Sequence, residues 1–108
     1  MNPKLKEKWV AALRSGKYKQ GQFALKDAHN TYCCLGVLHE IADGSFDDLP
    51  ENGLLPNTTA KLAGLTGTKP NCIYEEVSLR NPQRKLAILN DDKGYDFNQI
   101  ATWIEENL

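Results

Sequence analysis

The sequence predicts a mainly helical α+β domain, with about five short helices around a central helix over residues 34–43 and one small antiparallel β-hairpin. Three observations predict this fold class. Residues 32–42 form the longest stretch with few charges, as expected of a segment in the middle of a core. Segments on both sides repeat apolar residues at helical spacing. The 108 residues, 41% hydrophobic and 25% charged, have the composition of one globular domain, residues 1–108.

The first helix is predicted over residues 3–15. Asn2 can cap it, and Pro3 fits its first turn because that position needs no backbone N–H donor. Trp9 is the main anchor of its apolar face. Gly16 is expected to end it, since glycine readily adopts the left-handed conformation that closes many helices.

The β-hairpin is predicted to pair residues 22–26 with residues 31–34 in antiparallel fashion. Residues 27–30 are Asp, Ala, His and Asn, and Asp and Asn side chains favour turns by bonding nearby backbone groups. The residues after this turn favour β-structure. Two strands alone are marginally stable in water, so we expect the hairpin to pack on helices.

The central helix is predicted to bury a stripe that includes Leu35, Leu38 and Ile41. Gly36 lies inside this helix, where glycine costs about 1 kcal/mol relative to alanine. We therefore expect another backbone, from the hairpin or the last helix, to approach the central helix closely at this position. Gly44 is expected to follow the end of the helix.

Three more helices are predicted towards the C-terminus. The first covers about residues 58–63 and ends at Gly64, and the second covers about residues 82–90. The third begins after Asp96, and Gln99 stands where a capping box requires it, three residues after the cap.

Charge is distributed unevenly along the chain. Residues 1–26 carry a net charge of +6 and residues 27–108 a net charge of −7. The two regions could face each other across surface ion pairs, which is the interpretation we favour, or the first could form an anion-binding face. The sequence pI of about 6.1 and the lack of a known motif weigh against nucleic-acid binding.

Location and redox state follow from what the sequence contains. The charged residues 1–8 do not resemble a signal peptide, and no apolar run approaches the roughly 20 residues of a membrane span, so we expect a cytoplasmic protein. Three cysteines without C-x-x-C spacing predict reduced thiols rather than a zinc site or a disulfide framework.

A nucleophilic thiol is one candidate for chemistry. Cys34 at a helix N-terminus could combine with His29 or His39 and with Asn90 or Asp91 in a Cys-His-Asn arrangement. However, His39 is five positions after Cys34 on the same helix and therefore points away from it. Cysteines are also more often small buried apolar residues than nucleophiles. We therefore expect no catalytic residue.

Residues 90–96 invite interpretation as a metal-binding loop. The calcium-loop template places oxygen ligands at positions 1, 3 and 5 and glycine at position 6, and aligning Gly94 with that glycine puts Leu89 at position 1. Helix capping by Asn90, Asp91 and Asp96 explains these residues better. The sequence therefore predicts neither a metal nor a cofactor.

Polar side chains near two glycines form the candidate binding site. Long polar residues near Gly16 and Gly21 could line a cradle for a phosphate or nucleotide, because backbone amides can approach a ligand at glycine. The alternative is a structural turn in which Arg14 is paired with Asp91 or Glu105. The expected ligand-binding residues are Arg14, Tyr18, Gln20, Gln22, Asn90 and Asp91.

Four pieces of the chain, in order, resemble a family of small uncharacterised bacteriophage proteins. The pattern is W-x-x-A-L-R-S-G-x-Y-x-Q-G from Trp9, Y-C-C-L-G-V-L from Tyr32, L-N-D from Leu89 and F-x-x-I-A-x-x-I-E from Phe97. The resemblance covers both ends and the centre of the chain but not residues 44–80. It implies phage origin; small phage proteins of this kind are often accessory proteins, and several unrelated ones disarm host defences, which is an analogy of context only.

The function expected from the residues and the resemblance together is that of a phage accessory binding protein in the host cytoplasm. Its partner would be a host defence component, either a nucleotide-like signal that it sequesters or a protein that it binds. The alternatives are a small Cys-dependent hydrolase and a non-specific nucleic-acid-binding protein. The sequence does not indicate an oligomeric state.

Overall fold

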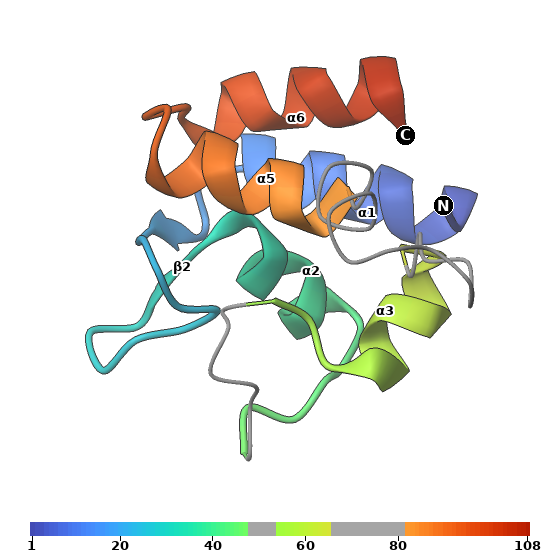
Figure 1. Ribbon diagram of the computed structural model, residues 1–108, viewed down its shortest axis with the longest axis horizontal. Coiled ribbons are helices and arrows are strands. Elements are labelled where there is room, and N and C mark those ends of the chain that lie inside the picture. The colour runs from blue at the N-terminus through green and yellow to red at the C-terminus, as the bar shows by residue number, and fades with distance from the viewer. Residues whose placement is uncertain (48–53, 66–81) are drawn as a thin grey trace, which may run out of the picture.

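The computed structural model describes residues 1–47, 54–65 and 82–108, and it confirms a mainly helical α+β fold (Figure 1). The described part contains five helices and one two-stranded sheet. The helices are α1 (Pro3–Arg14), α2 (Cys34–Ile41), α3 (Asn57–Ala63), α5 (Pro82–Asp91) and α6 (Phe97–Asn107). The strands are β1 (Lys19–Gln20) and β2 (Thr31–Tyr32).

The helices stack in layers around one core. In Figure 1, α1 and α5 lie across the middle of the molecule, with α6 on one side of them and α2 on the other. Ile100 and Ile104 of α6, Leu86 of α5 and Leu35 of α2 are fully buried in the same apolar cluster. The C-terminal helix is therefore joined to the central helix through α1 and α5.

Helix α1 begins as predicted and ends at Arg14, one residue before the predicted end. The Asn2 side chain accepts hydrogen bonds from the backbone N–H groups of Lys4 (3.0 Å) and Leu5 (3.3 Å). Trp9 is completely buried, and its indole Nε1 donates to the carbonyl oxygen of Cys34 over 2.9 Å. The anchor that the sequence predicts thus fills the core and also ties α1 to the start of α2.

The prediction of an antiparallel hairpin is wrong in its strand direction and its bounds. Strands β1 and β2 run parallel, with Lys19 paired to Thr31 and Gln20 to Tyr32, and the antiparallel pairing reduces to one bridge between Lys26 and Tyr32. Phe23 has φ of +66°, so residues 22–26 cannot form a regular strand. The chain reverses at this bend and again after Lys26, and two reversals restore the direction of β1.

The turn itself lies where the sequence predicts it. One carboxylate oxygen of Asp27 accepts from the N–H groups of His29 (2.8 Å) and Thr31 (3.1 Å), and the other accepts from the Thr31 hydroxyl (2.6 Å). These bonds stabilise the charged carboxylate and lower the pKa of Asp27 below its ordinary value.

Helix α2 lies in the centre of the molecule, and residues 34–39 are all buried. A Cβ atom at Gly36 would overlap the backbone carbonyl of Leu25, so the segment before the turn lies directly against the helix. The predicted close approach of another backbone at Gly36 is therefore confirmed. The helix ends at Ile41, two residues before the predicted end at residue 43.

The C-terminal helices also match their predicted positions. Helix α3 begins after Pro56, and Gly64 adopts φ of +74° at its end. Asp96 caps α6 by accepting from the N–H of Gln99 (2.8 Å), and the Gln99 side chain accepts from the N–H of Asp96 (2.9 Å), which completes the predicted capping box. In the described part of the chain, no helix has the length and apolarity needed to cross a bilayer.

Candidate functional site

Asn90, near the end of α5, is the centre of a buried hydrogen-bond network. Its Oδ1 accepts from Gln20 Nε2 (2.9 Å) and from the backbone N–H of Cys34 (3.2 Å). Its Nδ2 donates to the carbonyl oxygen of Gly21 (2.8 Å) and to Asp91 Oδ1 (2.8 Å). The side chain is completely buried and uses its full capacity of two donated and two accepted bonds. It therefore fixes the segment after β1 and the start of α2 relative to α5.

Backbone carbonyls fix the orientation of two glutamine amides beside this network. Gln20 Nε2 also donates to the carbonyl oxygen of Tyr95 (2.8 Å), and Gln22 Nε2 donates to that of Asn90 (3.4 Å). Because a carbonyl oxygen can only accept, the nitrogen of each amide must face it. The Oε1 atoms of Gln20 and Gln22 are thereby left for other partners.

A polar hollow of about 370 Å³ opens beside these amides. It lies between the segment that follows β1 and the turn that joins α5 to α6. Its lining is Gln20, Gly21, Gln22, Asn90, Gly94, Tyr95 and Asp96, and we refer to it as the amide hollow. Because Asn90 holds both walls, the shape of the hollow is set before any ligand arrives.

An exposed aromatic residue with unusual backbone geometry stands next to the amide hollow. Phe23 follows Gln22, has φ of +66° and is 71% exposed. Its N–H donates to Asp91 Oδ1 over 3.0 Å, and this bond holds the bend. Strained backbone and an exposed large apolar side chain both cost free energy, and such costs concentrate at binding sites.

The structure brings together four of the six residues predicted to bind a ligand. Gln20, Gln22 and Asn90 line the amide hollow, and Asp91, which is not part of the lining, bonds Asn90 and the backbone of Phe23. Tyr18 lies outside it and packs edge-on against the Tyr32 ring, with 5.3 Å between ring centroids.

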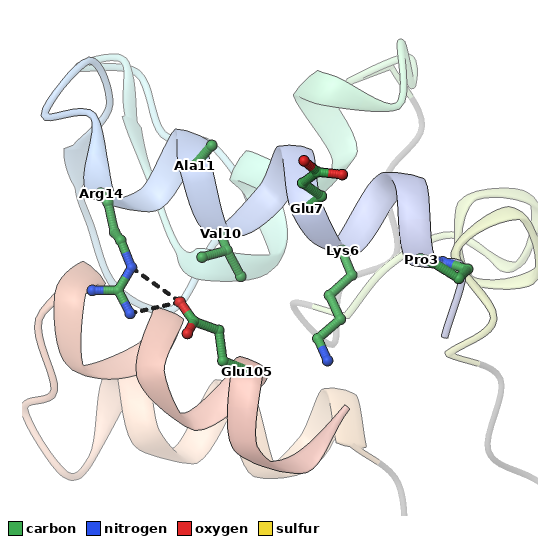
Figure 2. Close-up of a pocket in the computed structure, with 7 residues that line it drawn as sticks. All are labelled: Pro3, Lys6, Glu7, Val10, Ala11, Arg14 and Glu105. Atoms are coloured by element: carbon green, nitrogen blue, oxygen red, sulfur yellow. Dashed lines mark hydrogen bonds and ion pairs between the residues drawn. The ribbon is translucent and has the colours of Figure 1, made fainter.

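Arg14 is also outside the amide hollow, in a separate groove between α1 and α6 (Figure 2). Its guanidinium bonds to Glu105 Oε1 (2.8 Å) and to the Thr102 hydroxyl (3.1 Å). Of the two partners considered for Arg14, the structure selects Glu105. Figure 2 shows this ion pair at one end of the groove, with Val10 and Ala11 between it and the charged side chains nearer Pro3.

Within the described residues, the thiols of Cys33 and Cys34 are poorly placed for nucleophilic attack. Cys34 is completely buried, and burial raises its pKa well above the ordinary value, while its Sγ lies 3.6 Å from the carbonyl oxygen of Leu86. Burial likewise raises the pKa of Cys33 to about 11. A thiol with a raised pKa stays protonated near neutral pH, and the protonated form is a weak nucleophile.

Neither histidine assists these thiols. His39 is buried, and its Nε2 lies 2.6 Å from the carbonyl oxygen of Ser45, so Nε2 must carry the proton. Nδ1 then accepts from the Thr59 hydroxyl over 2.9 Å. His29 is exposed in the turn after Asp27, where its N–H bonds the Asp27 carboxylate. Both ring nitrogens of the buried histidine are thus engaged in structural bonds.

Besides Gly21, three residues of the amide hollow were not expected to bind a ligand. Gly94 and Asp96 were weighed as part of a metal-binding loop and then assigned to the connection between two helices, and Tyr95 between them was not singled out. The signal that could have found them is an aromatic residue in a short Gly- and Asp-rich connection, where a buried role is uncommon. Among the residues that the structure describes, no group of three His, Cys, Asp or Glu side chains could hold a metal ion.

Comparison with known proteins gives one match. A family model described as "Domain of unknown function (DUF8296)" matches residues 1–108. No curated protein and no solved structure matches the chain.

Proposed function

We propose that this chain, which belongs to the DUF8296 family, is a binding protein that acts without covalent chemistry and holds its ligand in the amide hollow. The observation that carries the proposal is the Asn90 network, which fixes a polar cavity between segments about 70 residues apart. Burying a polar hub is costly unless every bond is made, and here every bond is made. A pre-formed cavity loses little conformational freedom when a ligand binds.

The resemblance to small phage proteins supplies the biological setting of the proposal. In that setting the ligand is a host defence component, either a nucleotide-like signal or a defence protein, and the chain acts in the host cytoplasm. The buried thiols favour binding over the Cys-dependent hydrolase, because burial and the raised pKa of Cys34 both oppose formation of a thiolate.

The test is an NMR titration of the isotopically labelled protein with a panel of nucleosides, nucleotides and amino-acid derivatives. Binders should shift the side-chain amide signals of Gln20 and Gln22 and the backbone signal of Tyr95. Gln22→Ala should lower the affinity for these ligands, because Gln22 lines the hollow. It should leave the fold intact, because the Gln22 side chain makes a single long hydrogen bond of 3.4 Å within the described residues. Lys61→Ala on α3 is the matched control, because Lys61 is exposed and is not part of the hollow.

Two results would count against this proposal. Ligands that shift only signals of the groove between α1 and α6 would place the site there instead. Turnover of any panel member that Cys34→Ala abolishes would replace binding with catalysis.

A further inference from the structure

The hydrogen-bonding atoms left available in the amide hollow are mostly acceptors. Gln20 Nε2 donates both of its hydrogens, to Asn90 Oδ1 and to the carbonyl oxygen of Tyr95. Asn90 Nδ2 also donates both of its hydrogens, to the carbonyl oxygen of Gly21 and to Asp91 Oδ1. Gln20 Oε1, Gln22 Oε1 and one oxygen of Asp96 accept no hydrogen bond within the described part of the chain. Gln20 is only half-buried and has no buried polar side-chain atom without a partner, and Gln22 and Asp96 are exposed, so solvent reaches these side chains. A ligand rich in donors therefore matches most of these atoms; the second hydrogen of Gln22 Nε2 and the Tyr95 hydroxyl are the remaining side-chain donors of the lining.

The charge of the wall formed by residues 90–96 has the same implication, whereas the opposite wall carries Lys19 next to Gln20. Residues 90–96 contain Asp91, Asp92 and Asp96 against the single cation of Lys93. Asp91 uses one carboxylate oxygen for Phe23 and Asn90, and its other oxygen has no partner among the described residues. A phosphate would meet carboxylates and amide oxygens here, whereas a cationic donor would form charge-assisted bonds.

One exposed aromatic residue lines the hollow, and a second directly follows a lining residue in the sequence. Tyr95 lines it and is 36% exposed, and Phe23, beside Gln22, is 71% exposed. Aromatic faces attract cations, and the planar guanidinium group stacks on them better than an ammonium group does. Acceptors, the net negative charge of residues 90–96 and the Tyr95 ring together favour a flat cation that carries several donors.

We propose that the amide hollow binds a guanidinium group, carried either by an arginine side chain of a partner protein or by a free small molecule. The inference rests on the proposed function, which places the ligand in this hollow. The guanidinium donates to the Oε1 atoms of Gln20 and Gln22, and the carboxylates of Asp91 and Asp96 balance its charge.

The experiment is an NMR titration with four probes. These are a capped Gly-Arg-Gly peptide, its citrulline counterpart, agmatine and adenosine monophosphate. The arginine peptide and agmatine should shift the side-chain amides of Gln20 and Gln22, while citrulline, which keeps the shape but lacks the charge, should bind more weakly. Tighter binding of the peptide than of agmatine would indicate a protein partner, and the reverse would indicate a free guanidinium compound.

Charge substitutions at one exposed position sharpen the test. Gln22→Glu should tighten the arginine peptide by roughly two- to fivefold, the range expected for one exposed ion pair, and Gln22→Lys should weaken it by a similar factor. Lys61→Gln alters the net charge by the same amount as Gln22→Glu but lies on α3, and it should leave the affinity unchanged.

The failure of this inference and the failure of the proposed function give different results. Equal affinity for the citrulline and arginine peptides, or no shift with either guanidinium probe, would overturn the inference. Adenosine monophosphate shifting Gln20 and Gln22 while arginine does not would overturn the inference but keep the hollow as the binding site. Probes that bind only elsewhere on the protein would overturn both.

Discussion

Replacing Asn90 with alanine tests the network on which the site depends. The change removes four hydrogen bonds and leaves the buried N–H of Cys34 without its acceptor. An unsatisfied buried donor costs about 1–3 kcal/mol, and the other bonds contribute about 0.5–1.5 kcal/mol each. Because water can reach some of the remaining groups, we expect the free energy of unfolding to fall by about 2–4 kcal/mol in total. That is a large part of the roughly 5–15 kcal/mol that stabilises an ordinary domain.

Urea unfolding, followed by tryptophan fluorescence and far-UV circular dichroism, measures this loss. In thermal unfolding, the melting temperature should fall by roughly 8–32 °C, given about 4–8 °C per kcal/mol for a domain near this size. Asn98→Ala is the matched control, because Asn98 is exposed on α6 and its side chain is not in the network. We expect that control to change the unfolding free energy by no more than about 0.5 kcal/mol.

Asn90→Asp separates hydrogen bonding from shape. The aspartate keeps an oxygen facing Cys34 and Gln20, but its second oxygen meets the carbonyl of Gly21 and the carboxylate of Asp91, where the amide donated. It should therefore be clearly less stable than the parent protein at neutral pH. If Asn90→Ala costs no more than Asn98→Ala, or if Asn90→Asp is as stable as the parent, the reasoning about this network is refuted.

Four further predictions concern other parts of the fold. Gly36→Ala should lower the unfolding free energy by about 1–3 kcal/mol in urea, despite alanine's higher helix propensity, because its Cβ meets the Leu25 carbonyl; a stabilised variant would contradict the close approach. Arg14→Ala should cost at most about 1 kcal/mol, since its ion pair with Glu105 is 40% and 51% exposed at the two side chains; a larger loss by thermal melting would show that the pair is structural. At pH 8 the Cys33 thiol should react with iodoacetamide only on unfolding, because its pKa is raised to about 11; reaction of the native protein at the rate of a free thiol would disprove this. The same shift means that the native state binds more protons than the unfolded state between about pH 9 and pH 11, so stability should fall as pH rises through that range.

The elements that were predicted correctly are those governed by local chemistry. The caps at Asn2 and Asp96 depend on residues two or three positions away, and the structure contains both sets of bonds. The close approach at Gly36 was also predictable, because a glycine inside a buried helix needs a reason. By contrast, the strand direction depends on the bend at Phe23, where φ is positive. An aromatic residue rarely adopts positive φ, so the sequence does not predict a bend there.

The candidate site was predictable in part. Polar residues near Gly21 and the Asn90-Asp91 pair stood out by residue type, but nothing local indicates that Gln20 bonds Asn90, 70 residues later. The sequence left Arg14 with two possible partners, and only the packing of α6 against α1 decides for Glu105. Tyr95 was missed because its position between a glycine and a capping aspartate is explained well enough by helix termination.

The bond between the Cys34 N–H and Asn90 has a consequence for synthesis of the chain. Its two residues are 56 positions apart, so the start of the central helix emerges from the ribosome long before its acceptor exists. Until α5 has been translated, the Cys34 N–H in the first turn of the apolar helix α2 lacks its acceptor and can bond only water. The domain therefore completes its interior only when its last third has been made, and fragments truncated before Asn90 should be prone to aggregation and degradation.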